Sequence, residues 1–281
     1  MRSSLSFEFS PTKTAEGYRK LALTRAQLSQ FQPEFFSCTY GAGGSTKEGT
    51  LQTIRDILAE KRVSAVPHLV CIGSSSQEIQ DLISVYDELG IQELICLRGD
   101  LPSGVRETSG FNNAYELVYF LKNHYTTRFK LIVAAYPEVH PQAKNAQHDI
   151  DYFVMKCHAG ADKAITQYFY NIDAYCYFME AIEAKGLSLP IIPGIMPIYS
   201  FNKLTQFSKR CGAEIPRWLR LRLQSYADDT ASIRALGLDF VTSLCERLLS
   251  HGAPGLHFYT LNQAGLVSTI SVSYTHLRAH E

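Results

Sequence analysis

An excess of charge of either sign is missing from this sequence. Its 27 Lys and Arg residues balance its 27 Asp and Glu residues, and the isoelectric point is about 7.1. Without a surplus of basic residues there is no field to attract nucleic acid or an anionic membrane. A small-molecule substrate fits this composition better.

Long hydrophobic runs are missing too. No apolar run reaches the roughly 18 residues that a membrane-spanning helix needs. The N-terminal residues MRSSLSFEFS lack the apolar region of a signal peptide. We therefore expect a soluble, cytoplasmic protein with no membrane partner.

The cysteines are not arranged for cross-linking or for metal binding. There are seven, an odd number, and none forms a C-x-x-C pair. This spacing argues against a disulfide framework and against a zinc site. His148 and His158 fall on different faces of a predicted helix, so we expect no bound metal.

Glycine-rich nucleotide loops are absent as well. Gly41, Gly43 and Gly44 follow a predicted strand, but Thr46 stands where the third glycine of G-x-G-x-x-G should be, and no G-K-[ST] ending follows. These departures exclude both the dinucleotide-binding fingerprint and the P-loop.

Strand-like and helix-like segments alternate along the chain. Short runs that are apolar on both faces predict eight buried parallel strands, at 6–9, 35–40, 65–72, 93–100, 130–137, 163–169, 190–196 and 255–261. Segments with helical spacing separate them, at 14–30, 48–61, 76–89, 112–125, 144–159, 172–185, 201–211 and 214–251. Eight such units predict a single-domain α/β protein, a closed (β/α)8 TIM barrel, over residues 1–270.

Two segments depart from this alternation. Residues 214–229 add an amphipathic helix, after which Asp228 and Asp229 are expected to cap a helix starting near Thr230. Residues 271–281, SVSYTHLRAHE, show no amphipathic order. We expect this tail to be non-native or unstructured and to carry no functional residue.

Polar residues recur at the carboxyl ends of the predicted strands. In a (β/α)8 barrel these ends form the active site. They carry Glu8, Thr39, Tyr40, His68, Arg98, Asp100, Tyr136, Glu138, His140, Gln167, Asn262 and Gln263.

Glu8 lies between Phe7 and Phe9, where an ionised carboxylate would be costly to bury. Desolvation should raise its pKa, which suits a general acid. The alternative is a carboxylate that points outward. In a closed barrel no strand is an edge, which favours the functional interpretation.

Three other strand ends allow two interpretations each. Arg98, Gly99 and Asp100 can form a ligand site that Gly99 opens to the backbone, or a plain turn with an internal ion pair. His68 is by default a core histidine, unless a cofactor lies against it. His140 lies in a proline-bounded loop, where a ligand-binding side chain would be held rigidly.

Eight blocks of this sequence closely resemble, in order and spacing, those of bacterial methylenetetrahydrofolate reductases. The blocks are SFEFSP, CTYGAGGS, PHLVC, RGDLP, AAYPEVHP, AGADKAITQYFY, IIPGIMPI and HFYTLNQA, and they cover residues 5 to about 268. The resemblance implies bound FAD, NADH or NADPH as reductant, and conversion of 5,10-methylenetetrahydrofolate to 5-methyltetrahydrofolate in a ping-pong cycle. It also implies a homo-oligomer and a place in one-carbon metabolism and methionine biosynthesis.

The resemblance also assigns roles to residues. Glu8 matches the general acid, and Asp100 matches a carboxylate that stabilises a cationic folate intermediate. The substrate-binding positions are Asp100, Gln167, Lys203, Phe207 and Gln263. The flavin and nicotinamide positions are Thr39, Tyr40, Ala42, His68, Arg98, Gly99, Asp100, Ala114, Tyr136, His140, Ala143, Asp149 and Lys156.

The chain departs from the family at the outer end of the cofactor region. Tyr152 and Met155 stand where members have polar or basic residues, and residues 103–113 align poorly. Two other functions stay open at this point. One is a flavin-free pterin-binding barrel methyltransferase, and the other is a catalytically silent barrel.

Overall fold

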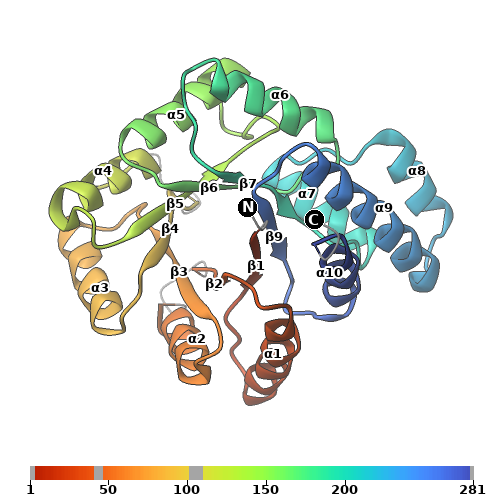
Figure 1. The fold of residues 1–281 in the computed structure, drawn as a ribbon, viewed down its shortest axis with the longest axis horizontal. Coiled ribbons are helices and arrows are strands. Elements are labelled where there is room, and N and C mark those ends of the chain that lie inside the picture. Colours follow the sequence, from red (N-terminus) through yellow and green to blue (C-terminus); the bar gives the residue numbers. More distant parts are fainter. Residues whose placement is uncertain (1–3, 41–46, 101–109, 279–281) are drawn as a thin grey trace.

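Parallel strands form a ring at the centre of the molecule, and helices surround it (Figure 1). The structure, a computed structural model, describes residues 4–40, 47–100 and 110–278. The strands are β1 Ser4–Phe9, β2 Phe35–Cys38, β3 Ser64–Val70, β4 Glu93–Leu97, β5 Lys130–Ala135, β6 Lys163–Thr166, β7 Ile191–Ile192, β8 Gly194–Ile195 and β9 Gly255–Tyr259. The predicted single-domain barrel is confirmed.

The seventh predicted strand is broken into two short pieces. β7 pairs with β6, whereas β8 pairs with β9, so the sheet order runs β7-β6-β5-β4-β3-β2-β1-β9-β8. Pro193 separates the two pieces, because proline has no N–H to donate to a strand ladder. The carbonyl of Pro193 still accepts a hydrogen bond from the His257 N–H, at 3.0 Å. Because β7 and β8 stand at the two ends of the sheet order, the covalent link through Pro193 joins these ends and completes the ring.

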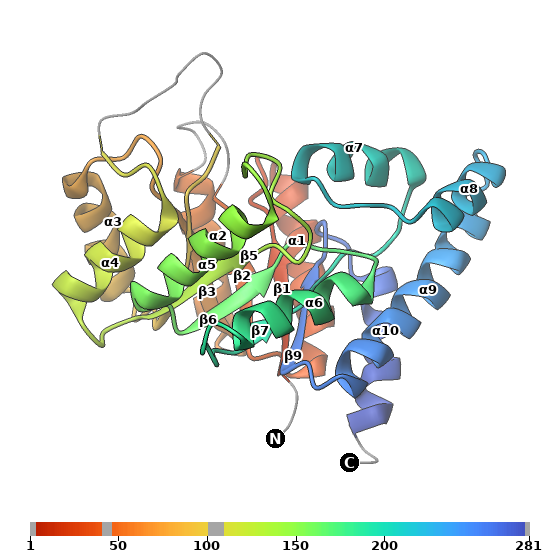
Figure 2. The ribbon, with the colours of Figure 1, turned by 90° about the horizontal axis from the view of Figure 1, so that it is seen from above.

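Helices cover the outside of the ring and one rim of it. They are α1 Ala15–Leu28, α2 Lys47–Glu60, α3 Ser76–Glu88, α4 Ala114–Tyr125, α5 Ala146–His158, α6 Ile172–Glu183, α7 Phe201–Cys211, α8 Arg217–Ser225, α9 Thr230–Ser250 and α10 Gly265–Arg278, with a short 3-10 turn at Ser29–Phe31. Figure 2 shows α7 above the carboxyl ends of the strands and α8 farther out. No helix in the described ranges combines the length and the apolar character needed to cross a membrane.

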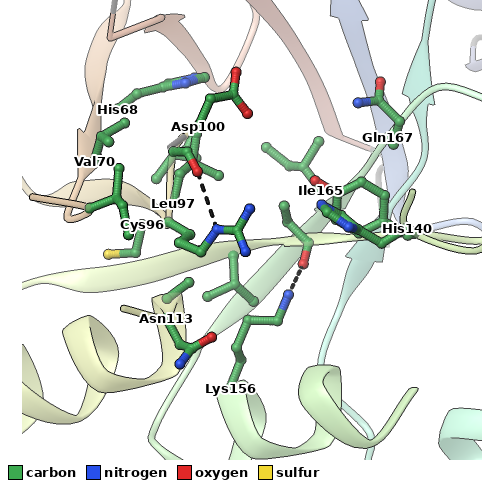
Figure 3. Close-up of a pocket in the computed structure, with 18 of the residues that line it drawn as sticks. His68, Val70, Cys96, Leu97, Asp100, Asn113, His140, Lys156, Ile165 and Gln167 are labelled. Carbon is green, nitrogen blue, oxygen red and sulfur yellow. Dashed lines mark hydrogen bonds between the residues drawn. The ribbon is translucent and has the colours of Figure 1, made fainter. Parts of the chain in front are cut away.

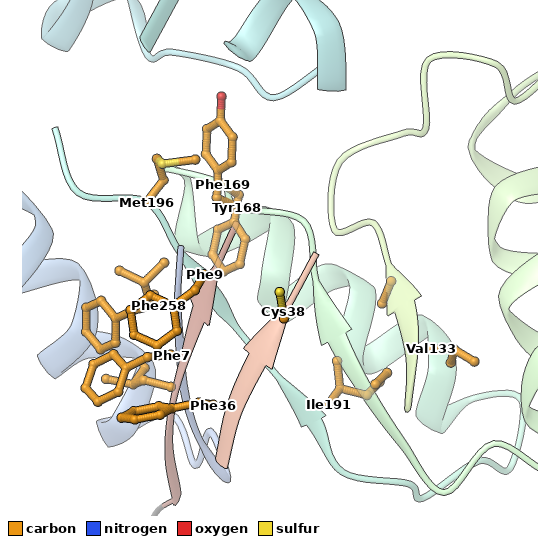
Figure 4. Close-up of a cluster of buried hydrophobic side chains, with 14 of the residues drawn as sticks. Phe7, Phe9, Phe36, Cys38, Val133, Tyr168, Phe169, Ile191, Met196 and Phe258 are labelled. Atoms are coloured by element: carbon orange, nitrogen blue, oxygen red, sulfur yellow. The ribbon is translucent and has the colours of Figure 1, made fainter. Parts of the chain in front are cut away.

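Side chains alternate between the inside and the outside of the barrel. One residue from each of six strands fills the interior: Phe35, Val66, Ile95, Ile132, Ile165 and Ile192. Outward-facing phenylalanines such as Phe7, Phe36 and Phe258 pack toward the helices (Figure 4). Since side chains alternate along a strand, positions two residues beyond the inner layer also point inward. His68 and Gln167 occupy such positions, one layer closer to the carboxyl rim.

The C-terminal segment differs from the expectation. Helix α10 continues through 271–278, so it was wrong to expect this part of the tail to be unstructured. Val267, Ile270 and Ser271 are all buried, and they share one face of the helix at the spacing i, i+3, i+4. Helix α10 packs against α9. The non-native origin of the tail stays a prediction.

The extra amphipathic helix and one of its two predicted caps are confirmed. Helix α8 precedes α9, and the Asp229 carboxylate accepts hydrogen bonds from the N–H groups of Ala231 and Ser232, both at 3.1 Å. The hydrogen bonds shown for Asp228 run instead through its backbone carbonyl. Asp229, not the pair, therefore caps α9.

Gly194 allows three strands to meet at the carboxyl end of the barrel. Its N–H donates to the Thr166 hydroxyl at 2.9 Å, and the Tyr259 hydroxyl donates to the Thr166 carbonyl at 2.7 Å. A Cβ on Gly194 would lie 2.2 Å from that carbonyl oxygen and 2.6 Å from the Tyr259 ring. A larger residue would push these strands apart.

Gly194→Ala should therefore lower the free energy of unfolding by about 1–3 kcal/mol, the usual cost of overpacking a core. Gly265→Ala is the control, because a Cβ there meets nothing within 4 Å. Urea unfolding of both variants measures the difference. Equal unfolding free energies would show that the close approach at Gly194 is not a constraint.

Candidate active site

A cavity of about 1130 Å³ opens at the carboxyl ends of the strands. Fourteen of the predicted site residues line it: Glu8, Thr39, Tyr40, His68, Arg98, Gly99, Asp100, Ala114, Tyr136, His140, Ala143, Asp149, Lys156 and Gln167. Figure 3 shows Gln167 and His140 on the side opposite His68 and Val70, with Lys156 reaching in from α5. One cavity thus brings together predicted residues from six strand ends and two helices.

Four predicted residues are placed differently. Lys203 is exposed on α7, and Phe207 packs against the main core from the same helix. The Gln263 carbonyl accepts a hydrogen bond from the Tyr199 hydroxyl. These three residues are not among those that line the cavity. Ala42 lies outside the described residues.

Glu8 faces inward, between two histidines. Its Oε2 lies 3.3 Å from Nε2 of His68 and 3.7 Å from Nε2 of His257. Ser6 stands behind His257, with its hydroxyl 2.8 Å from Nδ1. The carboxylate favours a proton on Nε2, so the serine hydroxyl donates to Nδ1. Ser6, His257, Glu8 and His68 form the histidine cage, as we call this group.

The prediction for the pKa of Glu8 was wrong in direction. Burial does raise the pKa, but the attraction of His257 and His68 outweighs it and lowers the pKa to about 2. Burial also lowers the pKa of His257, although the nearby carboxylate opposes that change. At neutral pH the structure therefore holds an ionised Glu8 beside imidazole N–H groups.

Sequence reasoning missed three residues of this site. Ser6, His257 and Tyr259 point inward with Glu8 because β1 pairs with β9 in the register Ser6↔His257 and Glu8↔Tyr259. The alternation of His257, Phe258 and Tyr259 in the last strand could have indicated that the histidine and the tyrosine share one face of that strand. The closeness to Glu8, however, depends on barrel closure across about 250 residues of chain.

A half-buried cation, Lys156, lines the cavity. Lys156 donates to the Ala134 carbonyl and lies near the ring of Phe153, with Nζ 5.3 Å from the ring centroid. Burial lowers the pKa of Lys156 to about 8, although Asp149 partly opposes this change. A buried ammonium with an adjustable charge is suited to an anionic ligand group.

Arg98 adds a second cation. Its Nε donates to the Gly99 carbonyl at 3.2 Å, and the guanidinium also binds the Gln142 side chain. Gly99 has φ +87°, and a Cβ there would lie 2.3 Å from a methyl group of Val70. Only glycine lets the chain turn here so that Asp100 reaches the cavity rim.

The loop after β5 holds His140 in a fixed orientation. The backbone N–H of His140 donates to Asp149 at 2.8 Å, and its ring Nδ1 accepts from the Gln142 N–H at 3.0 Å. The ring meets Tyr136 edge-on at 4.5 Å. Burial lowers the pKa of His140. The imidazole is therefore neutral and can present its Nε2–H as a donor.

Gln167 is held in a similar way. Its side-chain oxygen accepts the Tyr168 N–H at 3.0 Å, which leaves the amide NH2 as the group to offer a ligand. Tyr168 in turn bonds Ser208 of α7 at 3.0 Å. Within the described ranges, no three His, Cys, Asp or Glu side chains gather to hold a metal ion.

Comparison with known families decides how this site is to be interpreted. The model of the family described as methylenetetrahydrofolate reductase matches residues 1–274. The chain belongs to the methylenetetrahydrofolate reductase family. The resemblance noted from the sequence motifs is thereby confirmed.

Curated members of the family are similar over most of this chain. A 5,10-methylenetetrahydrofolate reductase of Buchnera aphidicola is 36% identical over 94% of this chain and 89% of its own length. The Escherichia coli enzyme is 35% identical over 93% and 87%. Methylenetetrahydrofolate reductase (NADH) 1 of Arabidopsis thaliana is 34% identical, but only 46% of that longer protein is covered.

Solved structures show the same fold at low sequence identity. A Clostridium thermocellum protein, described as binding two copies of 5-methyl-5,6,7,8-tetrahydrofolic acid, matches with a TM-score of 0.67 and 18% identity, covering 100% of this chain and 97% of that one. A dihydropteroate synthase from Xanthomonas albilineans matches with a TM-score of 0.55 and 11% identity, covering 99% and 94%.

Lys156 makes anion binding depend on pH. A lysine with a pKa of about 8 loses its charge as the pH rises through 8. The dissociation constant of ADP, a diphosphate-bearing probe, should therefore rise by up to about tenfold between pH 7.5 and pH 9. Isothermal titration calorimetry measures it.

Lys156→Gln should bind ADP weakly at every pH in this range. Lys144→Gln, which removes an exposed lysine two residues before α5, should keep the pH dependence of the unchanged chain. A flat profile for the unchanged chain would contradict the role of Lys156.

Proposed function

We propose that this chain reduces 5,10-methylenetetrahydrofolate to 5-methyltetrahydrofolate with bound FAD and with NADH or NADPH as the reductant. One observation carries the proposal: a single cavity joins the histidine cage, two cations and the aromatic rings of Tyr115 and Tyr152. Family membership supports the folate chemistry, and the cavity supports the cofactor.

The cavity fits a dinucleotide. Its volume exceeds the roughly 300–1,000 Å³ of an ordinary small-molecule site, so it has room for a cofactor and a second ring. Arg98 and Lys156 line the same cavity as the histidine cage, and their positive charges would hold the diphosphate that links two ring systems. When bound, the flavin supplies the redox chemistry by accepting a hydride from the nicotinamide and passing it to the folate.

Glu8 delivers the proton that opens the five-membered ring of the folate at N10. Its carboxylate lines the cavity. The Nε2 atoms of His68 and His257 lie beside it, so the proton can be held on the carboxylate or on either imidazole. Bound folate excludes water and raises the pKa of Glu8, toward the range in which a carboxyl group can act as an acid. The proton belongs to the coupled group rather than to one residue.

Asp100 and Gln167 act on the substrate ring. Asp100 lies at the rim, where its negative charge stabilises the cationic iminium that forms when the ring opens. Gln167 offers its amide to whichever ring lies in the site, the nicotinamide first and the folate second. Lys203, Phe207 and Gln263 stay predicted substrate contacts, although none of them lines the cavity in this structure.

The main alternative is a pterin-binding methyltransferase without flavin. The structural neighbour that binds 5-methyltetrahydrofolate makes this alternative reasonable. Against it, the cavity also presents Arg98 and Lys156, two cations suited to a diphosphate, which a pterin lacks. The intact carboxylates Glu8 and Asp100 argue against a silent barrel.

Anaerobic mixing separates the two half-reactions. The flavin-loaded protein is first mixed with NADH and then with methylenetetrahydrofolate, and the flavin absorbance is followed. The proposal requires bleaching in the first step and recovery in the second. A purified protein that takes up no flavin would support the methyltransferase alternative instead.

Glu8→Gln should keep flavin reduction by NADH within about twofold but slow folate reduction at least about 100-fold, because only the second step needs the proton. Glu93→Gln is the control, since Glu93 pairs with Lys163 at the amino end of the barrel. It should leave both steps close to those of the unchanged chain. An equal loss of both steps in Glu8→Gln would overturn the assignment of Glu8 as the acid.

A further inference from the structure

Ser37 lies on the inner face of the barrel, on the strand between those of Glu8 and His68. Strand β2 pairs with β1 in the register Glu8↔Ser37 and with β3 in the register Ser37↔Val66. Phe35 belongs to the inner layer, so Ser37, two residues later, also points inward. Neighbouring strands lie about 4.8 Å apart. Ser37 is therefore a direct neighbour of the histidine cage.

The hydroxyl group of Ser37 is buried and lacks a partner. The residue is 0% exposed, and among the described residues its Oγ has no hydrogen-bond partner. A serine hydroxyl can donate one hydrogen bond and accept others. Because buried polar atoms are nearly always hydrogen-bonded, this oxygen indicates a bound group that completes it.

Two imidazole nitrogens beside Glu8 share this property. Nε2 of His68 and Nε2 of His257 are buried, and neither has a hydrogen-bond partner within the part of the chain that the structure describes. They lie 3.3 and 3.7 Å from Oε2 of Glu8, farther than the roughly 2.7–2.9 Å of a charge-assisted hydrogen bond. Three polar atoms that need partners, from three different strands, thus lie around one carboxylate.

A water molecule matches this set of groups. Internal waters occur where buried polar groups lack protein partners, and each makes about two to four hydrogen bonds. Such a water can donate to the Glu8 carboxylate while it accepts from an imidazole N–H and from the serine hydroxyl. There is also room for it, because Ser37 is smaller than every side chain of the inner layer below it.

We propose that Ser37 and the histidine cage hold an internal water molecule against the Glu8 carboxylate, and that Ser37 is thereby a positioning residue for the proton transfer. Ser37 is not among the residues that line the cavity, so a ligand that fills the cavity leaves its hydroxyl in place. When Glu8 gives its proton to N10 of the folate, the carboxylate keeps the electron pair of the broken O–H bond. The water then donates a hydrogen bond to this new negative charge. The catalytic part of this inference rests on the proposed function, whereas the water site does not.

A crystal structure of the unchanged chain, at a resolution that shows ordered water, tests the site directly. It should show a water within hydrogen-bond distance of both Ser37 Oγ and the Glu8 carboxylate. Other ordered internal waters without one at this position would overturn the inference, whatever the activity of the protein.

Two variants of nearly equal size isolate the hydroxyl. Ser37→Thr keeps it, whereas Ser37→Val replaces it with a methyl group, so both add similar bulk to the barrel interior. Ser37→Val should slow folate reduction by about tenfold relative to Ser37→Thr, because a hydrogen bond to a charged group is lost. Flavin reduction by NADH should differ by less than about twofold, since that step needs no proton from Glu8. The anaerobic half-reactions measure both steps.

Two further variants control for packing. Ser37→Ala removes the hydroxyl without adding bulk, and it should show the same selective loss if the larger residues do not fold. Thr24→Val removes a buried hydroxyl on α1, which donates to the Lys20 carbonyl at 3.0 Å, and it should leave both steps unchanged.

The outcomes separate this inference from the proposed function. Equal rates of folate reduction in Ser37→Thr and Ser37→Val, or an equal loss of both half-reactions in Ser37→Val and in Ser37→Ala, would overturn the role of Ser37 while the proposed function stands. If the unchanged chain reduces no folate, the proposed function fails, and the crystal structure still decides whether the water site exists.

Discussion

An ionised carboxylate close to the axis of a barrel needs partners, and the contact between Glu8 and two imidazoles meets that need. Burial alone would drive Glu8 to its neutral form. His68 comes from β3 and His257 from β9, so the contact exists only when three strands, β9, β1 and β3, are aligned with their inward positions at one level. Ser6 then fixes which imidazole nitrogen faces the carboxylate. The electrostatics at the centre of the site therefore depend on the closure of the ring.

From this centre the cavity changes character toward its outer end. The histidine cage holds a carboxylate between two imidazoles, Arg98 and Lys156 supply positive charge, and Tyr115 and Tyr152 supply flat aromatic surfaces. These functions come from different elements, the strand ends for the cage and helices α4 and α5 for the outer rings. A long ligand with alternating rings and charge matches this gradient better than a compact one. The order of the three regions supports a dinucleotide with its reactive ring at the cage.

Local patterns were sufficient to predict the barrel and most of the cavity lining. Apolar runs marked all eight strand positions, and polar residues at their ends, such as His68 and Gln167, do face the cavity. Features that depend on distant contacts were not readable. His257 approaches Glu8 only through the pairing of β1 with β9, and without it desolvation alone predicted the wrong direction for the pKa of Glu8. The buried face of α10 could be identified only from the structure, in which α10 packs against α9.

The central claim is that the histidine cage keeps Glu8 ionised and shares the reaction's proton with it. Carbon-13 NMR of protein labelled at glutamate side-chain carboxyl carbons measures this directly, because Glu8→Gln removes one resonance and so assigns it. If the cage holds Glu8 ionised, this resonance keeps the chemical shift of a carboxylate from pH 8 down to pH 4, with a pKa well below the ordinary value. A resonance that titrates at or above the ordinary glutamate pKa of about 4.3 would contradict the account.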